Sequence, residues 1–194
     1  MDLRKFLLIA TIPLFLNGCV AAAVLAGAGA GAMSANVASD RRGVSQQFAD
    51  RGISNNAHDI LTYDSQLYKH SRISTATYDG VILLVGQVQT PELKQRAGKL
   101  AQQIDGVKKV YNELSISGDE SMLASIDDSW ITSKVKTMML RRAGLSSSNI
   151  KIVTENGVVY LMGDVSHQQA QLAADTARRV GGVRRVVEVF QQHS

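Results

Sequence analysis

The chain has 194 residues, of which 45% are apolar and 20% charged, and its formal net charge at pH 7 is +4. This length allows one or two small domains, and the composition supports a packed core and excludes wholesale disorder. A single cysteine excludes a disulfide framework and a thiolate-rich metal site. Because only 5% of the residues are aromatic, binding of single-stranded nucleic acid by base stacking is disfavoured, and we expect no nucleic-acid partner.

Residues 1–18 have the layout of a signal peptide that is cleaved from the mature protein. A basic start precedes an apolar run over residues 6–16, which is too short to span a bilayer comfortably. The run leads into Leu16-Asn17-Gly18-Cys19, which resembles a bacterial lipobox, where the cysteine is acylated after cleavage in front of it. The resemblance implies that Cys19 is the lipid attachment site. Val20 replaces the aspartate of the inner-membrane retention signal, so we expect anchoring in the outer membrane.

The segment after the cleavage site, residues 19–43, is rich in alanine and glycine. We predict a flexible tether here, because no run of about 20 strongly apolar residues follows Cys19. The alternative is a packed membrane helix, since Gly27 and Gly31 have the small-xxx-small spacing of such helices.

The rest of the chain contains two copies of one unit. Residues 79–88 align without gaps on residues 156–165, and residues 106–110 match residues 182–186. Two copies of one supersecondary unit predict two similar domains in tandem. The predicted domains span residues 44–117 and 124–192, with a linker at residues 118–123.

Copy one begins with a weakly patterned helix at residues 53–61. Asp79-Gly80 then predicts a β-hairpin, because a two-residue type I′ turn needs positive φ at both positions. Thr90-Pro91 caps a second helix that stops near Gly106, and residues 107–116 form a third strand. The apolar face of the second helix consists of Leu93, Ala97, Leu100 and Ile104.

Copy two repeats this order. A helix over residues 130–142 precedes a hairpin with Asn156-Gly157 at its turn, and after a second helix that stops near Gly182 a third strand covers residues 183–190. The helical spacing predicts that the first helix packs on the sheet through Ile131, Val135, Met138 and Met139. The second helix has the apolar face Ala170, Ala173, Ala177 and Val180.

Each copy has a Gly-Val-x-Leu-x-Gly hairpin and a Gly-Val-(Lys/Arg)-(Lys/Arg)-Val third strand, a combination that looks like a BON domain. With the lipobox in front, the chain resembles the dual-BON outer-membrane lipoproteins. The fold class expected is therefore α+β, with two tandem BON domains. Each has the order helix-strand-strand-helix-strand and packs a small mixed sheet against two helices. The resemblance implies a non-enzymatic, lipid-anchored protein on the periplasmic face of the outer membrane.

The same resemblance implies that the second BON domain binds an anionic, phosphatidylglycerol-like phospholipid membrane, and that the protein supports envelope integrity and gathers at division sites. The charge distribution agrees with lipid binding by the second domain. Residues 44–120 carry eight basic and nine acidic side chains, whereas residues 121–194 carry nine basic and six acidic side chains. A stripe at helical spacing combines an indole with two long cations, which suits a lipid interface. It consists of Trp130, Lys134, Thr137 and Arg141.

Two alternatives stay open. In the first, Trp130 caps the core and the basic residues of the stripe form a solvated face. We also expect three basic pairs elsewhere to be solvated: Lys108-Lys109, Arg178-Arg179 and Arg184-Arg185. The last pair extends the basic surface of the stripe if its strand lies beside the helix. In the second, the protein is an adaptor for envelope proteins in outer-membrane assembly or cell-wall hydrolase regulation.

Catalytic and metal-binding patterns are missing from the sequence. The four histidines have no metal-ligand spacing, and the glycine-rich stretch lacks the context of a phosphate loop. The adjacent Asp127 and Asp128 leave a helix on different faces, which indicates capping and helix-dipole roles and not a catalytic pair. We therefore expect no enzymatic activity, no cofactor and no metal.

Overall fold

The computed structural model describes residues 43–117 and 128–192. The predicted signal peptide, Cys19, the tether and the predicted linker lie outside the described residues, apart from Gly43 at the end of the tether. Among the described helices, none has the length and apolar character needed to cross a membrane.

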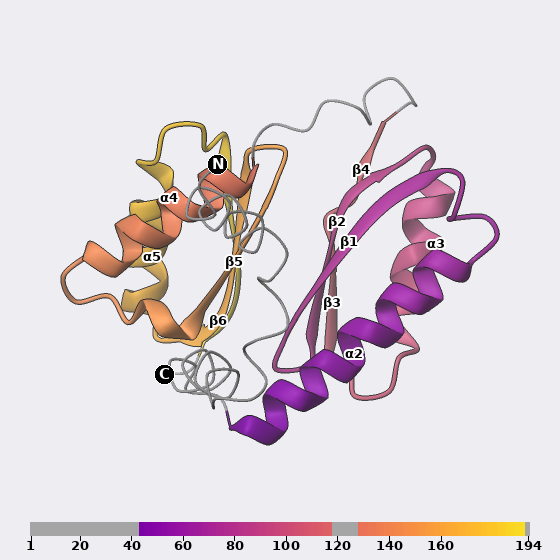
Figure 1. Ribbon diagram of the computed structural model, residues 1–194, viewed down its shortest axis with the longest axis horizontal. Helices are drawn as coiled ribbons and strands as arrows, with labels where there is room; N and C mark the ends of the chain where they lie inside the picture. Colours follow the sequence, from indigo (N-terminus) through magenta and orange to yellow (C-terminus); the bar gives the residue numbers. More distant parts are fainter. Residues whose placement is uncertain (1–42, 118–127, 193–194) are drawn as a thin grey trace, which may run out of the picture. The chain divides into compact units, whose positions relative to one another are not determined.

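Copy one forms a mixed sheet in which β1 is antiparallel to β2, while β3 and β4 are both parallel to β2 (Figure 1). A single third strand over residues 107–116 was expected, and this prediction is wrong. The strand is interrupted because Leu114 buries its side chain in the core and the Asn112 side chain turns to the backbone, donating to the Lys94 carbonyl at 2.7 Å. The elements are α2 (Val44–Tyr63), β1 (Ser71–Tyr78), β2 (Val81–Val88), α3 (Pro91–Gln102), β3 (Lys109–Asn112) and β4 (Ser115–Ile116).

Copy two has the same order, with a continuous third strand. Its sheet runs β5-β6-β7, with β5 antiparallel and β7 parallel to β6. This confirms the expected α+β class and the order helix-strand-strand-helix-strand in each copy. The elements are α4 (Asp128–Arg141), the short 3-10 turn η2 (Ser147–Asn149), β5 (Ile150–Glu155), β6 (Val158–Val165), α5 (His167–Arg178) and β7 (Arg185–Gln192).

The first helix of copy one is longer than expected. The prediction covered residues 53–61, but α2 runs from Val44 to Tyr63. Only its later part has the apolar spacing of a core helix, with Ile53, Ala57 and Leu61 buried at intervals of four residues. The first two turns carry no such pattern, so periodicity did not reveal them.

Both hairpin turns have the predicted backbone. Asp79 and Gly80 have φ of 47° and 74°, and Asn156 and Gly157 have φ of 50° and 72°. Positive φ at both central positions is the type I′ geometry that matches the twist of the flanking strands. The two hairpins are therefore set by the same local chemistry.

A carboxylate from the preceding helix holds each of these turns. Asp50 accepts hydrogen bonds from the backbone N–H groups of Asp79 and Gly80 at 2.8 and 2.9 Å. Asp128 does the same for Asn156 and Gly157 at 2.7 and 2.8 Å. The expected capping role of Asp128 is thus replaced by a long-range clamp, although the residue does lie in the acidic first turn of α4. Asp127 lies outside the described residues.

A second bond repeats in the same way and fixes the register of each helix on its sheet. The Ser54 hydroxyl donates to the Thr77 hydroxyl at 2.9 Å, and the hydroxyls of Thr132 and Thr154 lie 2.6 Å apart. Asp50 and Ser54 both precede their copy-two partners by 78 positions. Residues 50–63 of α2 therefore have defined counterparts on α4, 78 positions later.

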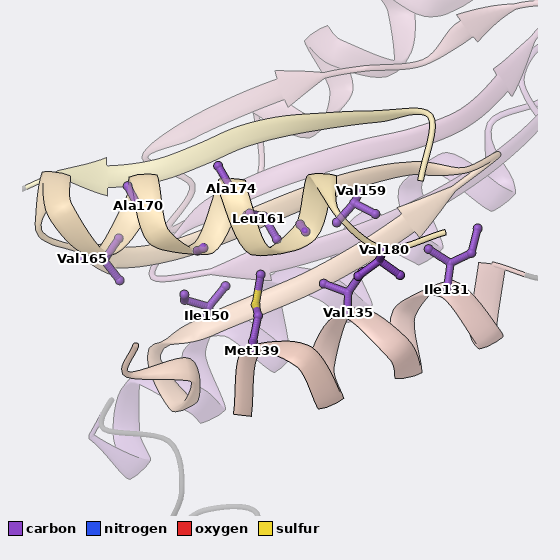
Figure 2. Close-up of a cluster of buried hydrophobic side chains, with 12 residues drawn as sticks. Ile131, Val135, Met139, Ile150, Val159, Leu161, Val165, Ala170, Ala174 and Val180 are labelled. Carbon is purple, nitrogen blue, oxygen red and sulfur yellow. The ribbon is translucent and has the colours of Figure 1, made fainter. Parts of the chain in front are cut away.

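Helices α4 and α5 cover one face of the copy-two sheet (Figure 2). Ile131, Val135 and Met139 point from α4 into this cluster and are almost fully buried. The prediction that Met138 also packs on the sheet is wrong, because its side chain is 43% exposed. Copy one buries the matching face of its sheet under α2 and α3.

The other face of each sheet is also buried. Along β6, Val159 and Leu161 belong to the helix-covered cluster, whereas Tyr160 and Met162 belong to a separate cluster. That cluster combines residues of both sheets. Because strand side chains alternate between faces, burial on both sides explains why β2 is buried at every position.

Replacing Gly157 with valine should destabilise copy two by more than about 1 kcal/mol, because a β-branched residue is strained at positive φ. A Cβ atom there would also lie 3.1 Å from both the Gly182 carbonyl oxygen and the Arg184 Cγ atom. Thermal unfolding measures the effect. Gly181→Val is the matched control, because nothing lies within 4 Å of a Cβ at Gly181. An unchanged melting temperature for Gly157→Val would contradict the turn assignment.

Candidate functional site

The four stripe residues all lie on the solvent-facing side of α4. Trp130 is 48% exposed, and Lys134, Thr137 and Arg141 are exposed as well. The core of copy two is instead formed by the opposite side of the helix. Trp130 therefore lies at the surface, and the structure does not support the alternative in which it caps the core.

A pocket of about 370 Å³ opens beside this face of α4. Three of the four stripe residues line it, and Arg141 does not. The far wall comes from the end of α5, where Arg179 was expected to be merely solvated. The lining residues are Trp130, Ser133, Lys134, Thr137, Met138, Arg179, Val180 and Gly181.

The tryptophan ring and a cation are stacked at this pocket. The Lys134 Nζ atom lies 3.4 Å from the centroid of the Trp130 ring, within the range of a cation–π contact. The stacking keeps the indole and the ammonium group next to each other on the exposed side of α4. The Thr137 hydroxyl donates to the Ser133 carbonyl at 2.8 Å, which leaves its oxygen lone pairs as acceptors.

Two further apolar side chains on α4 face solvent. Leu140 is 70% exposed, and Met138 lies exposed at the pocket. Together with Trp130 they place apolar side chains among the cations of this helix. We call the pocket residues together with Leu140 and Arg141 the α4 site.

The same positions in copy one have different chemistry. Trp130 corresponds to Gly52, Lys134 to Asn56, and Thr137 to Asp59. At the end of the second helix, where the two copies differ by 76 positions, Gln103 replaces Arg179 and Asp105 replaces Gly181. Tyr63 takes the position of Arg141. Copy one thus has two carboxylates and no cation at the positions where copy two has the cations Lys134, Arg141 and Arg179. We call Gly52, Asn56, Asp59, Tyr63, Gln103 and Asp105 the copy-one face.

The other basic pairs mostly contact acidic neighbours. Arg178 contacts Asp175 and Glu188 at 2.9 and 3.2 Å, and Lys108 contacts Asp79 at 2.9 Å. Arg184 and Arg185 do not line the pocket, so the extension of the patch onto this strand is not supported. Arg179 was not predicted as a site residue, because Arg178 and Arg179 are adjacent and both were expected to be solvated. Aligning the two copies at the end of the second helix would have shown the Gln103-to-Arg179 change.

The fold order, the paired hairpins and the two turn clamps define a pair of related small α+β domains. The family model for the BON domain matches residues 49–118 and 127–192, and the chain belongs to the BON-domain family. It is 36% identical over 189 residues to the outer membrane lipoprotein DolP of Haemophilus influenzae, covering 97% of this chain and 96% of that one. These findings support a dual-BON outer-membrane lipoprotein, lipid-anchored on the periplasmic face.

Other similarities are less complete. A 21 kDa hemolysin of Actinobacillus pleuropneumoniae is 36% identical over 152 residues, which is 78% of each chain. The solved C-terminal domain of CdsD from Chlamydia trachomatis, a structural protein of the type III secretion system, matches 72% of this chain and 96% of its own with 11% identity and a TM-score of 0.30. This structural likeness is too low to support any conclusion about function.

Proposed function

We propose that this lipoprotein binds anionic phospholipid of the phosphatidylglycerol type through the α4 site of its second BON domain. It catalyses no reaction. Lipid binding places the folded domains at anionic regions of the membrane leaflet that holds the anchor, including division sites, where the protein supports envelope integrity.

The observation that carries this proposal is the difference between the two copies. The α4 site and the copy-one face occupy equivalent positions on the same fold, so the fold itself requires neither set of side chains. Copy two nevertheless has an exposed indole and three cations at these positions, while copy one has glycine, amides, carboxylates and one exposed tyrosine, with no cation. A surface that differs in this way between two copies of one domain indicates a binding role for copy two.

The arrangement of the α4 site suits a lipid headgroup layer. Trp130, Met138 and Leu140 supply apolar surface, and an indole prefers the boundary between acyl chains and water. Lys134 and Arg179 border the pocket, where they can meet the phosphate of a headgroup. Each cation held near an anionic membrane surface contributes about 1 kcal/mol, and salt screens this contribution.

The experiment that tests the proposal is vesicle binding by a charge-reversed variant. Lys134→Glu combined with Arg141→Glu should lower the affinity for phosphatidylglycerol vesicles at least tenfold at low salt, because two attractive charges become repulsive. The same variant should lose most of the salt dependence of binding. Sedimentation of the unacylated protein with vesicles at two salt concentrations measures both effects.

The matched control is Asn56→Glu combined with Tyr63→Glu, which places the same two carboxylates at the counterpart positions on α2. It should bind as the unchanged protein does. An equal loss in both variants would show that added carboxylates weaken binding wherever they lie on the two domains, and it would overturn the assignment to the α4 site. In cells, the charge-reversed protein should stay in the outer-membrane fraction and lose its enrichment at division sites.

We also propose Cys19 as the acylated residue. Cys19→Ala should give a precursor that keeps residues 1–18, carries no lipid by mass spectrometry, and is lost from the outer-membrane fraction. The physical reason is that acyl chains provide most of the binding energy of such an anchor. Normal fractionation of the variant at the mature size would contradict this assignment.

A further inference from the structure

Helix α2 has an N-terminal extension in which Gln46 supports the hairpin clamp, because its side-chain amide donates to the Asp50 carboxylate at 3.3 Å. The clamp residue Asp50 is the seventh residue of the helix, so six residues precede it. These residues bury no side chain in the copy-one core, since the first buried residue of α2 is Asp50 itself. Val44 and Phe48 contribute to neither the core nor the clamp, so their side of the extension is available for another role.

The outward side of this extension is apolar and cationic. Val44 and Phe48 lie four residues apart and are 52% and 62% exposed. The Arg51 guanidinium lies over the Phe48 ring, 5.8 Å from its centroid. Further along the same side the residues become polar and acidic, with Asn55 followed by Asp59. The apolar and cationic character is thus confined to the first two turns.

Charge at this end of the helix also favours an anionic partner. The first turn of α2 has no acidic residue, and the carboxylate of Asp50 is directed inward to the hairpin turn. In the sequence, Arg41 and Arg42 come just before the helix. Val44 is also the helix end nearest along the chain to Cys19, only 25 residues away. Even fully extended, such a segment reaches about 90 Å, so an anchor at Cys19 confines this end to within that distance of the membrane.

We propose that the first two turns of α2 form a second membrane contact, in which Val44 and Phe48 enter the headgroup layer of the anionic leaflet and Arg51 pairs with lipid phosphate. The inference rests on the lipid anchor and is independent of the α4 site. Because the anchor already holds the chain at the membrane, even a weak contact becomes populated through its high effective concentration.

The test uses the acylated mature protein in liposomes that contain phosphatidylglycerol brominated high on an acyl chain, which quenches a tryptophan that reaches the boundary between headgroups and acyl chains. Since Trp130 is the only tryptophan, Trp130→Phe with Phe48→Trp places a single indole on the extension. Its fluorescence should shift to the blue and be quenched at least twofold more strongly than that of the matched control. The control is Trp130→Phe with Tyr63→Trp, which reports from the other end of α2 at a side chain that is 83% exposed.

Adding Arg51→Glu to the Phe48→Trp variant should reduce the quenching at position 48. Equal quenching at positions 48 and 63, or no quenching at position 48, would overturn the proposal. The unchanged protein, in which Trp130 is the reporter, tests the α4 site separately in the same liposomes. The two contacts therefore succeed or fail independently.

Discussion

Replacing Trp130 with glutamate should lower the affinity for phosphatidylglycerol vesicles by about 100-fold, which corresponds to about 2.7 kcal/mol. The indole loses its place at the boundary of the bilayer, and a carboxylate in an anionic headgroup layer is repelled and costly to desolvate. The melting temperature of the soluble protein should change by less than about 2 °C, because surface substitutions usually cost within about 0.5 kcal/mol. Vesicle sedimentation and thermal unfolding measure the two quantities.

The matched control is Gly52→Glu, which adds the same carboxylate at the counterpart position on α2, where nothing lies within 4 Å of an added Cβ atom. Binding by the unacylated form of this control should be unchanged, because without the anchor the weak contact at Phe48 and Arg51 is not populated. If Trp130→Glu instead unfolds at a much lower temperature and loses binding only in proportion, Trp130 serves the core. Full binding by a folded Trp130→Glu protein would move the lipid site elsewhere and favour the adaptor alternative.

The largest loss of stability is expected for Gly86→Ala in the middle of the copy-one hairpin. Gly86 has φ of 116°, a conformation that strains any L side chain, and an added Cβ atom would collide with the Arg72 carbonyl oxygen on β1. We expect a cost of about 3 kcal/mol or more and a fall in melting temperature of about 10 °C.

The control for this prediction is Gly52→Ala, at a helical position with open space around it. Alanine there should raise the stability slightly, by about 0.5–1 kcal/mol, because glycine is the poorer helix former. A melting temperature that is the same for Gly86→Ala and the unchanged protein would show that the β1–β2 hairpin is packed less closely than the structure has it.

Local turn chemistry and periodicity predicted much of the fold. Asp79-Gly80 identified its hairpin because the type I′ turn restricts sequence strongly, and Thr90 was predicted as a cap that does accept the Leu93 N–H at 3.3 Å. The clamp by Asp50 was not predictable, because it joins residues about 30 positions apart. The requirement for glycine at Gly86 comes likewise from a carbonyl on another strand.

The candidate site was predicted only in part, for a similar reason. Helical spacing brought Trp130 and Lys134 together, since both lie on one helix. Spacing alone did not determine whether Met138 faces the core or solvent, because this residue lies near the boundary between the core-facing and solvent-facing sides of α4. Arg179 reaches the site through tertiary packing of α5 beside α4, and no pattern within its own segment shows that approach.

The most direct test of lipid binding by copy two is a residue-by-residue NMR titration of the unacylated protein with phosphatidylglycerol micelles. We predict that the largest copy-two shifts cluster on residues 130–142 and 179–181. The counterpart positions Gly52, Asn56, Asp59 and 103–105 of copy one should stay unchanged. Equal shifts on the copy-one face, or shifts spread over both domains without a cluster on α4, would contradict the central claim.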